Sequence, residues 1–175
     1  MSNQAEPRLL FDSDEIAAAV NRLSEDIAFQ YRGRCPLLIG ILKGSFVFMA
    51  DLVRSLNFPL EVEFIRVSSY GGGRESSGRV KVVKGLISPV RGRDVLVVED
   101  IVDTGITLSF LLDYLRKRKP ASLKLCSLID KPSRRRVPVD IDFLGFTVPD
   151  RFIVGYGIDF DEKFRYLPDI RYLDD

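Results

Sequence analysis

A run of four consecutive apolar residues at positions 95–98 constrains the fold of this chain most strongly. Strands that are buried on both faces of a parallel sheet are continuously apolar, whereas strands with one solvated face alternate. Gly105 follows shortly, and from Leu108 apolar residues recur at i, i+3, i+4 and i+7 until Pro120. This spacing indicates an amphipathic helix. The segment therefore predicts a strand over residues 94–99, a loop and a helix, which is a β-loop-α unit.

Other segments repeat this alternation. An apolar strand is predicted over residues 37–42, and after Lys43-Gly44-Ser45 helical spacing resumes at Phe46. We predict an opening helix over 12–31, strands over 61–69, 79–84 and 123–129, and short strands near Phe143 and Ile153. Alternating strands and helices predict a single α/β domain with a central parallel sheet and flanking helices.

Composition excludes several classes of function. The chain has 175 residues and a formal net charge of +1, which gives no electrostatic footprint for nucleic acid or an anionic membrane. The basic run at residues 134–136 is interpreted as a solvated loop. The N-terminus lacks a signal-peptide pattern, and no apolar run approaches the ~20 residues that span a bilayer. We therefore expect a cytoplasmic protein without nucleic-acid or membrane partners.

The chain has no histidine, which excludes histidine-based triads and histidine-ligated metals. Cys35 and Cys126 are far apart and each adjoins apolar sequence, so both are expected to be small buried residues of a reduced protein. Any divalent metal must then be held by oxygen, which indicates Mg²⁺ or a similar hard ion.

Residues 99–107 carry the chemistry. Glu99, Asp100 and Asp103 would repel one another unless a metal ion, sugar hydroxyls or a proton compensates them. The following residues 104–107 open the helix, where backbone N–H groups, two threonine hydroxyls and the helix dipole can bind a monophosphate. A ribose 5-phosphate matches both parts of this segment, with its hydroxyls at the carboxylates and its phosphate at residues 104–107. The alternative is an acidic turn that only caps the helix, and it leaves Glu99 and Asp100 unexplained.

This segment resembles the phosphoribosyl-pyrophosphate motif of the type I phosphoribosyltransferases. The resemblance to their 6-oxopurine branch, the hypoxanthine-guanine phosphoribosyltransferases, extends from about residue 37 to about residue 171. The motifs that agree in order are Leu42-Lys43-Gly44, Ser69-Tyr70, residues 97–105, residues 127–131, residues 149–156, Asp159 and Phe164-Arg165. The resemblance implies transfer of a phosphoribosyl group to hypoxanthine, and also guanine, giving IMP or GMP and pyrophosphate in purine salvage.

Roles follow from the resemblance for the phosphoribosyl half of the site. Glu99 and Asp100 match the pair that engages the ribose hydroxyls and Mg²⁺, and Asp103 matches the residue that handles the proton at purine N7. Thr104, Gly105, Ile106 and Thr107 match the 5-phosphate loop, in which some relatives carry lysine at the position of Ile106.

The pyrophosphate half is implied in the same way. Lys43 and Gly44 match a loop with a non-proline cis peptide before the lysine. On the residues alone, this loop is interpreted as an ordinary turn with a solvated lysine. Arg165 matches the cation that meets pyrophosphate from the other side, and Asp159 matches a ligand of a second Mg²⁺.

For the purine, Lys131 matches a donor to the 6-oxo group. Phe152 matches a ring that stacks on the base, although burial statistics alone favour a core position. The backbone of Ile153 and the region of Asp159 would contact the edge of the purine and recognise it. The ranking of hypoxanthine, guanine and xanthine stays open.

The resemblance also implies an organisation: a core over about 10–135, a small hood over about 136–175 with an N-terminal contribution, and a flexible flap over about 69–79 that includes Ser69 and Tyr70. Taken alone, the glycine-rich flap could be a simple hairpin connection. A homodimer or homotetramer is implied. A nucleic-acid-binding regulator that keeps the site as a sensor, and a salvage enzyme for another base, remain alternative hypotheses.

Overall fold

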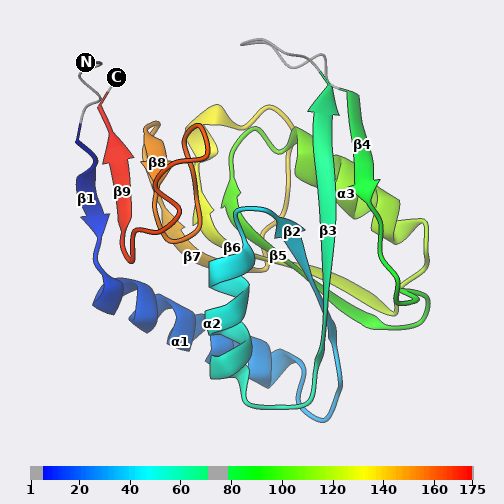
Figure 1. The fold of residues 1–175 in the computed structure, drawn as a ribbon. Helices are drawn as coiled ribbons and strands as arrows, with labels where there is room; N and C mark the ends of the chain where they lie inside the picture. The colour runs from blue at the N-terminus through cyan, green and yellow to red at the C-terminus, as the bar shows by residue number, and fades with distance from the viewer. Residues whose placement is uncertain (1–5, 71–78, 175) are drawn as a thin grey trace.

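The computed structural model describes residues 6–70 and 79–174 and contains two sheets (Figure 1). The larger sheet has six strands in the order β4-β3-β2-β5-β6-β7. Its strands are β2 (Leu37–Leu42), β3 (Glu61–Tyr70), β4 (Arg79–Lys84), β5 (Asp94–Val102), β6 (Ser122–Asp130) and β7 (Phe143–Thr147). All pairings are parallel except β3 with β4, which is an antiparallel hairpin. The predicted parallel sheet is thus confirmed, with one antiparallel edge strand.

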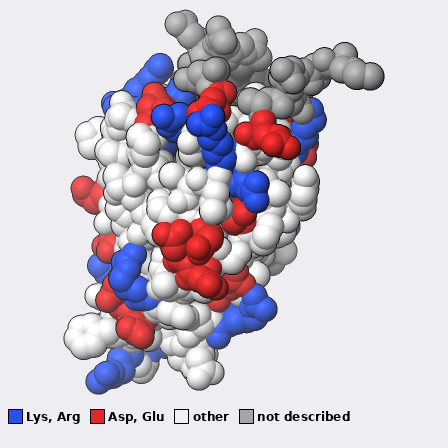
Figure 2. Space-filling model, turned by 90° about the vertical axis from the view of Figure 1, so that its left-hand side faces the viewer, with Lys and Arg blue, Asp and Glu red and all other residues white. Residues whose placement is uncertain are grey.

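The smaller sheet has three antiparallel strands in the order β1-β9-β8: β1 (Arg8–Phe11), β8 (Phe152–Val154) and β9 (Ile170–Leu173). Sequence reasoning did not predict β1 and β9, because each has only four residues and its partner lies far along the chain. Acidic and basic side chains are interspersed over the face that carries these two strands (Figure 2).

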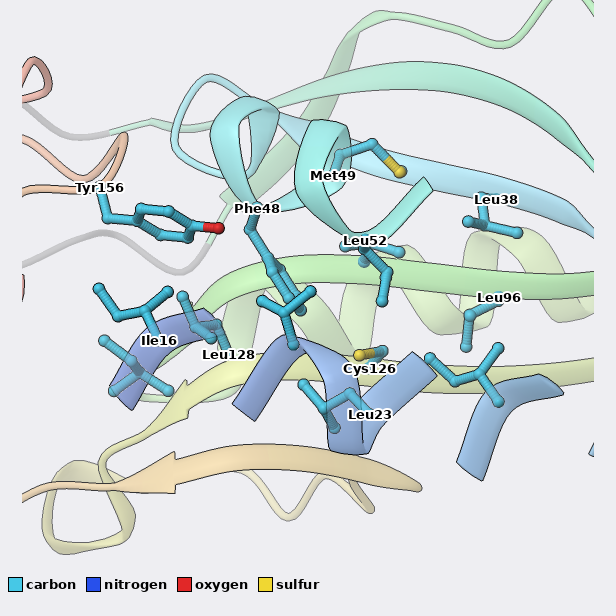
Figure 3. Packing of buried hydrophobic residues seen from close by; sticks show 14 of the residues in the cluster. Ile16, Leu23, Leu38, Phe48, Met49, Leu52, Leu96, Cys126, Leu128 and Tyr156 are labelled. Atoms are coloured by element: carbon cyan, nitrogen blue, oxygen red, sulfur yellow. The ribbon is translucent and has the colours of Figure 1, made fainter. Parts of the chain in front are cut away.

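Helices cover both faces of the larger sheet. The helices α1 (Ser13–Gln30) and α2 (Phe46–Leu56) pack on one face, and α3 (Ile106–Arg116) packs on the other. Alternate residues of β5 pack on opposite faces of the sheet. Leu96 lies in the hydrophobic cluster formed with α1 and α2, and Val97 lies in the hydrophobic cluster formed with α3. Figure 3 shows the first cluster from close by. Burial of both faces explains the continuous apolar run that predicted this strand.

Local signals determined the helix ends well. Asp12 caps α1, and its side chain accepts hydrogen bonds from the backbone N–H groups of Asp14 and Glu15 while Glu15 reaches back to the cap. This is a capping box, as the sequence indicates.

The prediction that both cysteines are buried was wrong for one of them. Cys126 is buried as expected, but Cys35 is exposed because it lies in the loop before β2 rather than in a strand.

Candidate active site

The end of β5 brings the predicted carboxylates beside the predicted phosphate loop. β5 extends to Val102, three residues beyond its predicted end, so Glu99 and Asp100 lie inside the strand and Asp103 follows it. A cavity of about 300 Å³ opens at this edge of the sheet. Six of the predicted residues line it, namely Glu99, Asp100, Asp103, Thr104, Gly105 and Thr107. Ligands of open α/β sheets bind at the carboxyl ends of the strands, as this cavity would allow.

Gly105 shapes the phosphate loop. It lies at the N-cap of α3 with φ +80°, a region that L side chains rarely adopt. A side-chain carbon there would also overlap the carbonyl oxygen of Val137. The segment containing Val137 is held against the loop, because the N–H groups of Arg136 and Val137 donate to the carbonyl of Thr104 at 2.9 and 3.0 Å. Only glycine satisfies both the backbone angle and the close approach.

Asp103 presents a free acceptor. Its Oδ1 atom is buried and receives no hydrogen bond from any part of the chain that the structure describes. Arg134 Nε lies 3.4 Å from this oxygen, which is within ion-pair distance, but the geometry is not that of a hydrogen bond. A buried carboxylate oxygen without a donor is costly unless a ligand supplies one. The atom is therefore suited to accept an N–H from a bound molecule.

Glu99 and Asp100 are adjacent acids near the end of β5. Burial, followed by the side chain of Asp100, raises the pKa of Glu99 well above its ordinary value. The backbone N–H of Asp100 donates to Glu99 Oε1 at 3.2 Å, and that of Ile101 donates to Asp100 Oδ1 at 2.9 Å. A cation beside these carboxylates would relieve their repulsion.

The donor set agrees with Mg²⁺ shared between protein and substrate. Within residues 6–70 and 79–174, no three potential ligands gather as a preformed metal cluster. Mg²⁺ commonly keeps several waters and is held by one or two carboxylates together with substrate phosphates. Glu99 with Asp100 provides such a pair at the sheet edge, and Asp159 provides a carboxylate in the loop between β8 and β9.

The loop after β2 lies directly against this acidic pair. The peptide between Leu42 and Lys43 is cis, as the family resemblance implies. A side-chain carbon at Gly44 would overlap the carboxylate of Asp100, so the loop and the carboxylate are in contact. Gly157 approaches the same loop from the other side, and a side-chain carbon there would lie 2.7 Å from the carbonyl oxygen of Gly44.

The two cations assigned to pyrophosphate are brought together by a residue that sequence reasoning missed. Glu162 Oε1 lies 2.7 Å from Lys43 Nζ, and Oε2 lies 3.3 Å from Arg165 Nη2. Hydrogen bonds from Lys43 first, and then from Arg165, lower the pKa of Glu162. Arg165 also pairs with Asp159 at 2.7 Å. Neither cation is solvated alone, contrary to the ordinary-turn interpretation of Lys43.

The residues assigned to the purine lie directly after β6 and in β8. Lys131 is 3% exposed, and its ammonium donates to the carbonyl of Arg151 at 2.7 Å and lies 3.3 Å from Asp150. Its backbone N–H donates to Val102 O at 2.9 Å, which joins this loop to the end of β5. Phe152 is 47% exposed, so the core position favoured by burial statistics was wrong.

Phe152 is exposed because of its position in β8. The strand has the burial pattern exposed-buried-buried, so Ile153 and Val154 face the core while Phe152 stands outside it. The ring meets Phe160 edge to face, with centroids 5.6 Å apart. Of the predicted flap, Ser69 and Tyr70 end β3 and Arg79 begins β4. Residues 71–78 and the side chains of these three residues lie outside the described part of the chain.

Comparison with known proteins decides the family. The family model described as a phosphoribosyl transferase domain matches residues 10–161. The chain belongs to the phosphoribosyl transferase family. The chain is 47% identical over 161 residues to the hypoxanthine-guanine phosphoribosyltransferase of Bacillus subtilis, covering 92% of this chain and 89% of that protein.

Two further relatives are informative. A crystal structure of a hypoxanthine-guanine phosphoribosyltransferase from Bacillus anthracis, with HEPES in its active site, has a TM-score of 0.92 and 42% identity over 98% of this chain and 100% of that one. The bifunctional protein TilS/HprT of Listeria monocytogenes is 47% identical over 92% of this chain. The chain spans only 25% of the length of that bifunctional protein.

Arg135 is a second residue near the site that the sequence did not predict. The run 134–136 was predicted to be solvated, but the side chain of Arg135 is only 17% exposed and forms a short ion pair with Asp130. Its Nε also donates to the carbonyl of Asp103 at 3.0 Å. The side chain thus ties the turn after β5 to the end of β6. Three adjacent arginines give no local signal for which one is buried.

A larger cavity of about 830 Å³ lies elsewhere, between α1, α2 and residues 165–168. Its lining is mostly apolar, and Arg165 is the one predicted site residue that touches it. We assign the chemistry to the smaller cavity because the free carboxylate oxygen, the acidic pair and the phosphate loop all converge there.

Proposed function

We propose that this chain transfers the 5-phosphoribosyl group of phosphoribosyl pyrophosphate to hypoxanthine, and also to guanine, giving the nucleoside monophosphate and pyrophosphate. The observation that carries the proposal is the free, buried Oδ1 of Asp103 in the cavity that also holds the phosphate loop. The family membership and the names of the Bacillus relatives support the same reaction.

In this reaction the phosphate loop binds the 5-phosphate. The backbone N–H groups of residues 104–107 and the N-terminus of α3 supply donors and a positive dipole end. Thr107 lines the cavity and adds a hydroxyl. Glu99 and Asp100 accept hydrogen bonds from the ribose hydroxyls, which orients C1 of the sugar for attack.

Asp103 holds the proton that leaves the purine. As a purine nitrogen bonds to C1 and pyrophosphate departs, the base becomes cationic. A carboxylate beside N7 then accepts the proton of the N7–H group. Oδ1 of Asp103 is suited to this because it accepts no hydrogen bond from the described chain, and Arg134 lies only at ion-pair distance from it. Lys43, Gly44 and Arg165 stabilise the departing pyrophosphate with positive charge and backbone N–H groups.

Lys131 selects the base. Its ammonium uses two contacts, to Arg151 O and to Asp150, and an ammonium has three donors. A third donor can meet the 6-oxo group of hypoxanthine or guanine, whereas the 6-amino group of adenine leaves that donor unpaired. The exposed ring of Phe152 stacks on the base, and the backbone of Ile153 reads its edge.

We propose that Glu99, Asp100 and Asp159 hold Mg²⁺ together with the substrate. When bound, the ion neutralises charge on the pyrophosphate group and so favours its departure. We also propose that the smaller sheet with residues 136–175 acts as a hood, that residues 69–79 act as a flap, and that the enzyme works in the cytoplasm as a homodimer or homotetramer. In the described part of the chain, no helix is long and apolar enough to cross a membrane.

Steady-state rates with hypoxanthine, guanine, xanthine and adenine, each with phosphoribosyl pyrophosphate and Mg²⁺, test the function. We expect hypoxanthine and guanine to be used and adenine, which lacks the 6-oxo group, to be used at least about 100-fold less well. Faster turnover of adenine than of hypoxanthine would overturn the base assignment. Absence of turnover with all four bases would overturn the reaction.

A further inference from the structure

Glu162 lies between the two cations that the proposed function assigns to pyrophosphate. Each of its carboxylate oxygens meets one of them: Oε1 is 2.7 Å from Lys43 Nζ and Oε2 is 3.3 Å from Arg165 Nη2. Lys43 is 119 residues away along the chain, so this contact exists only in the folded protein. The proposed reaction itself assigns no role to Glu162.

The backbone around Glu162 is arranged to present this carboxylate. Phe160 and Lys163 exchange backbone hydrogen bonds at 3.1 and 3.2 Å, and the two residues between them have φ of +54° and +59°. Glu162 is one of these, and glutamate has no local reason to adopt a left-handed backbone. Strain of this kind is concentrated at functional sites, where the surrounding structure maintains it.

Asp159 locks the same turn. Its Oδ2 accepts the backbone N–H of Glu162 at 2.8 Å, and its Oδ1 lies 2.7 Å from Arg165 Nη2. The other terminal nitrogen of Arg165 donates to the carbonyl of Gly157 at 2.8 Å. The arginine is therefore held by Asp159 and Gly157, and its contact to Glu162 at 3.3 Å is the longest of the three.

A carboxylate that uses both oxygens to bridge two cations resembles one phosphoryl group of pyrophosphate in charge and in bidentate geometry. The Glu162 carboxylate and a pyrophosphate group cannot occupy the same donors at the same time. The Glu162 side chain is 65% exposed and can swing into solvent, whereas Asp159 at 28% exposure is held by the turn. Glu162 is thus the removable anion of the two.

We propose that Glu162 is an internal competitor of pyrophosphate: it pairs with Lys43 and Arg165 in the unliganded protein, leaves when a pyrophosphate group binds, and returns as that group departs. The proposal rests on the assignment of these two cations to pyrophosphate. It predicts that Glu162 weakens the binding of pyrophosphate and accelerates its release, because a ligand that must displace an anion loses part of its binding energy.

Calorimetric titration of magnesium pyrophosphate into the full chain tests the proposal without relying on turnover. We compare the unmodified protein with Glu162→Gln, which keeps the shape and removes the charge, and with Glu162→Asn, since asparagine tolerates positive φ. Glu25→Gln, a change of an exposed carboxylate on α1, is the matched control. Thermal denaturation verifies folding of each variant, and the high exposure of Glu162 means that neither substitution removes core packing.

Both Glu162 variants should bind pyrophosphate about fivefold more tightly at low salt, as expected for loss of two partly exposed ion pairs that oppose binding. The gain should shrink as salt rises, and Glu25→Gln should match the unmodified protein. Equal affinity would show that Glu162 does not compete, and weaker binding would show that it supports the ligand; either result overturns the inference. If the unmodified protein binds neither pyrophosphate nor phosphoribosyl pyrophosphate, the proposed function itself fails.

Discussion

The carboxylate of Asp100 lies against the α-carbon of Gly44, so closely that any side-chain carbon at position 44 would overlap it. Asp100 belongs to β5 and Gly44 to the loop after β2, and these strands are neighbours in the parallel sheet. The contact sets the spacing between the residues proposed for ribose and those proposed for pyrophosphate. Two halves of one substrate would bind on either side of it.

Gly44→Ala should therefore separate the two halves of the site. We expect kcat/KM for phosphoribosyl pyrophosphate to fall by about 100-fold or more, because a displacement near 1 Å has effects of that size. Gly85→Ala is the control, since a side-chain carbon there would have no neighbour nearer than 3.8 Å. Comparable kinetics for the two variants would show that the contact is unimportant.

Asp103→Asn should remove proton handling while it leaves the phosphate loop in place. We expect kcat to fall by about 100-fold to 10,000-fold, the range for loss of a general acid–base group. The Kd for phosphoribosyl pyrophosphate, measured by calorimetry, should change little. Asp113→Asn on the exposed face of α3 is the control. Unchanged kcat in Asp103→Asn would refute the assigned role.

Lys131→Met should reduce discrimination between purines. The substitution removes the buried ammonium, so kcat/KM for hypoxanthine should fall by at least about tenfold while that for adenine changes less. The ratio of the two rates is the measurement, and Lys117→Met, at an exposed position, should keep the original ratio. An unchanged ratio in Lys131→Met would exclude contact between this lysine and the 6-substituent.

Arg135→Gln should loosen the turn after β5. The side chain pairs with Asp130 and donates to the carbonyl of Asp103, so its loss leaves partly buried acceptors unpaired. We expect the free energy of unfolding in urea to fall by about 2 kcal/mol, together with a higher KM for phosphoribosyl pyrophosphate. Arg136→Gln, at an exposed position, should be within about 0.5 kcal/mol of the unmodified protein.

Asp169→Asn tests a pH-dependent contribution to stability. Hydrogen bonds from Arg171 at 2.8 Å lower the pKa of Asp169 below 3.8 in the folded protein. Because the folded pKa is lowered, this stabilisation is present above pH 3.8 and is lost as the pH falls through the folded value. At pH 7 we expect the variant to lose about 1 kcal/mol of unfolding free energy.

The loss should shrink as the pH falls below 3.8, where the carboxyl group becomes protonated first in the unfolded protein and then, at lower pH, in the folded protein. Urea denaturation at pH 7 and at pH 3 measures the difference. Asp26→Asn, at an exposed position on α1, is the control. A loss that stays the same at both pH values would show that the charge of Asp169 is not its cause.

The sequence by itself determined the central sheet, its helices and the phosphate loop. Burial of both faces of β5 requires the continuous apolar run at 95–98, and the backbone angle of Gly105 requires glycine. These constraints act within a few residues, so they are visible as local patterns. The resemblance then supplied roles for the residues that no local pattern distinguishes, such as Lys131.

Only the tertiary structure decided which distant charges meet. Glu162 contacts Lys43, which is 119 residues away along the chain. Arg135 rather than its neighbours is the arginine that pairs with Asp130, and Phe152 stands outside the core although its residue type favours burial. The positions of Glu162 and Phe152 depend on the packing of β8 and the loop after it, whereas that of Arg135 depends on the loop after β6 in the larger sheet. Ion pairs and exposed rings carry no sequence period, because their partners are chosen by the packing of the chain rather than by spacing along it.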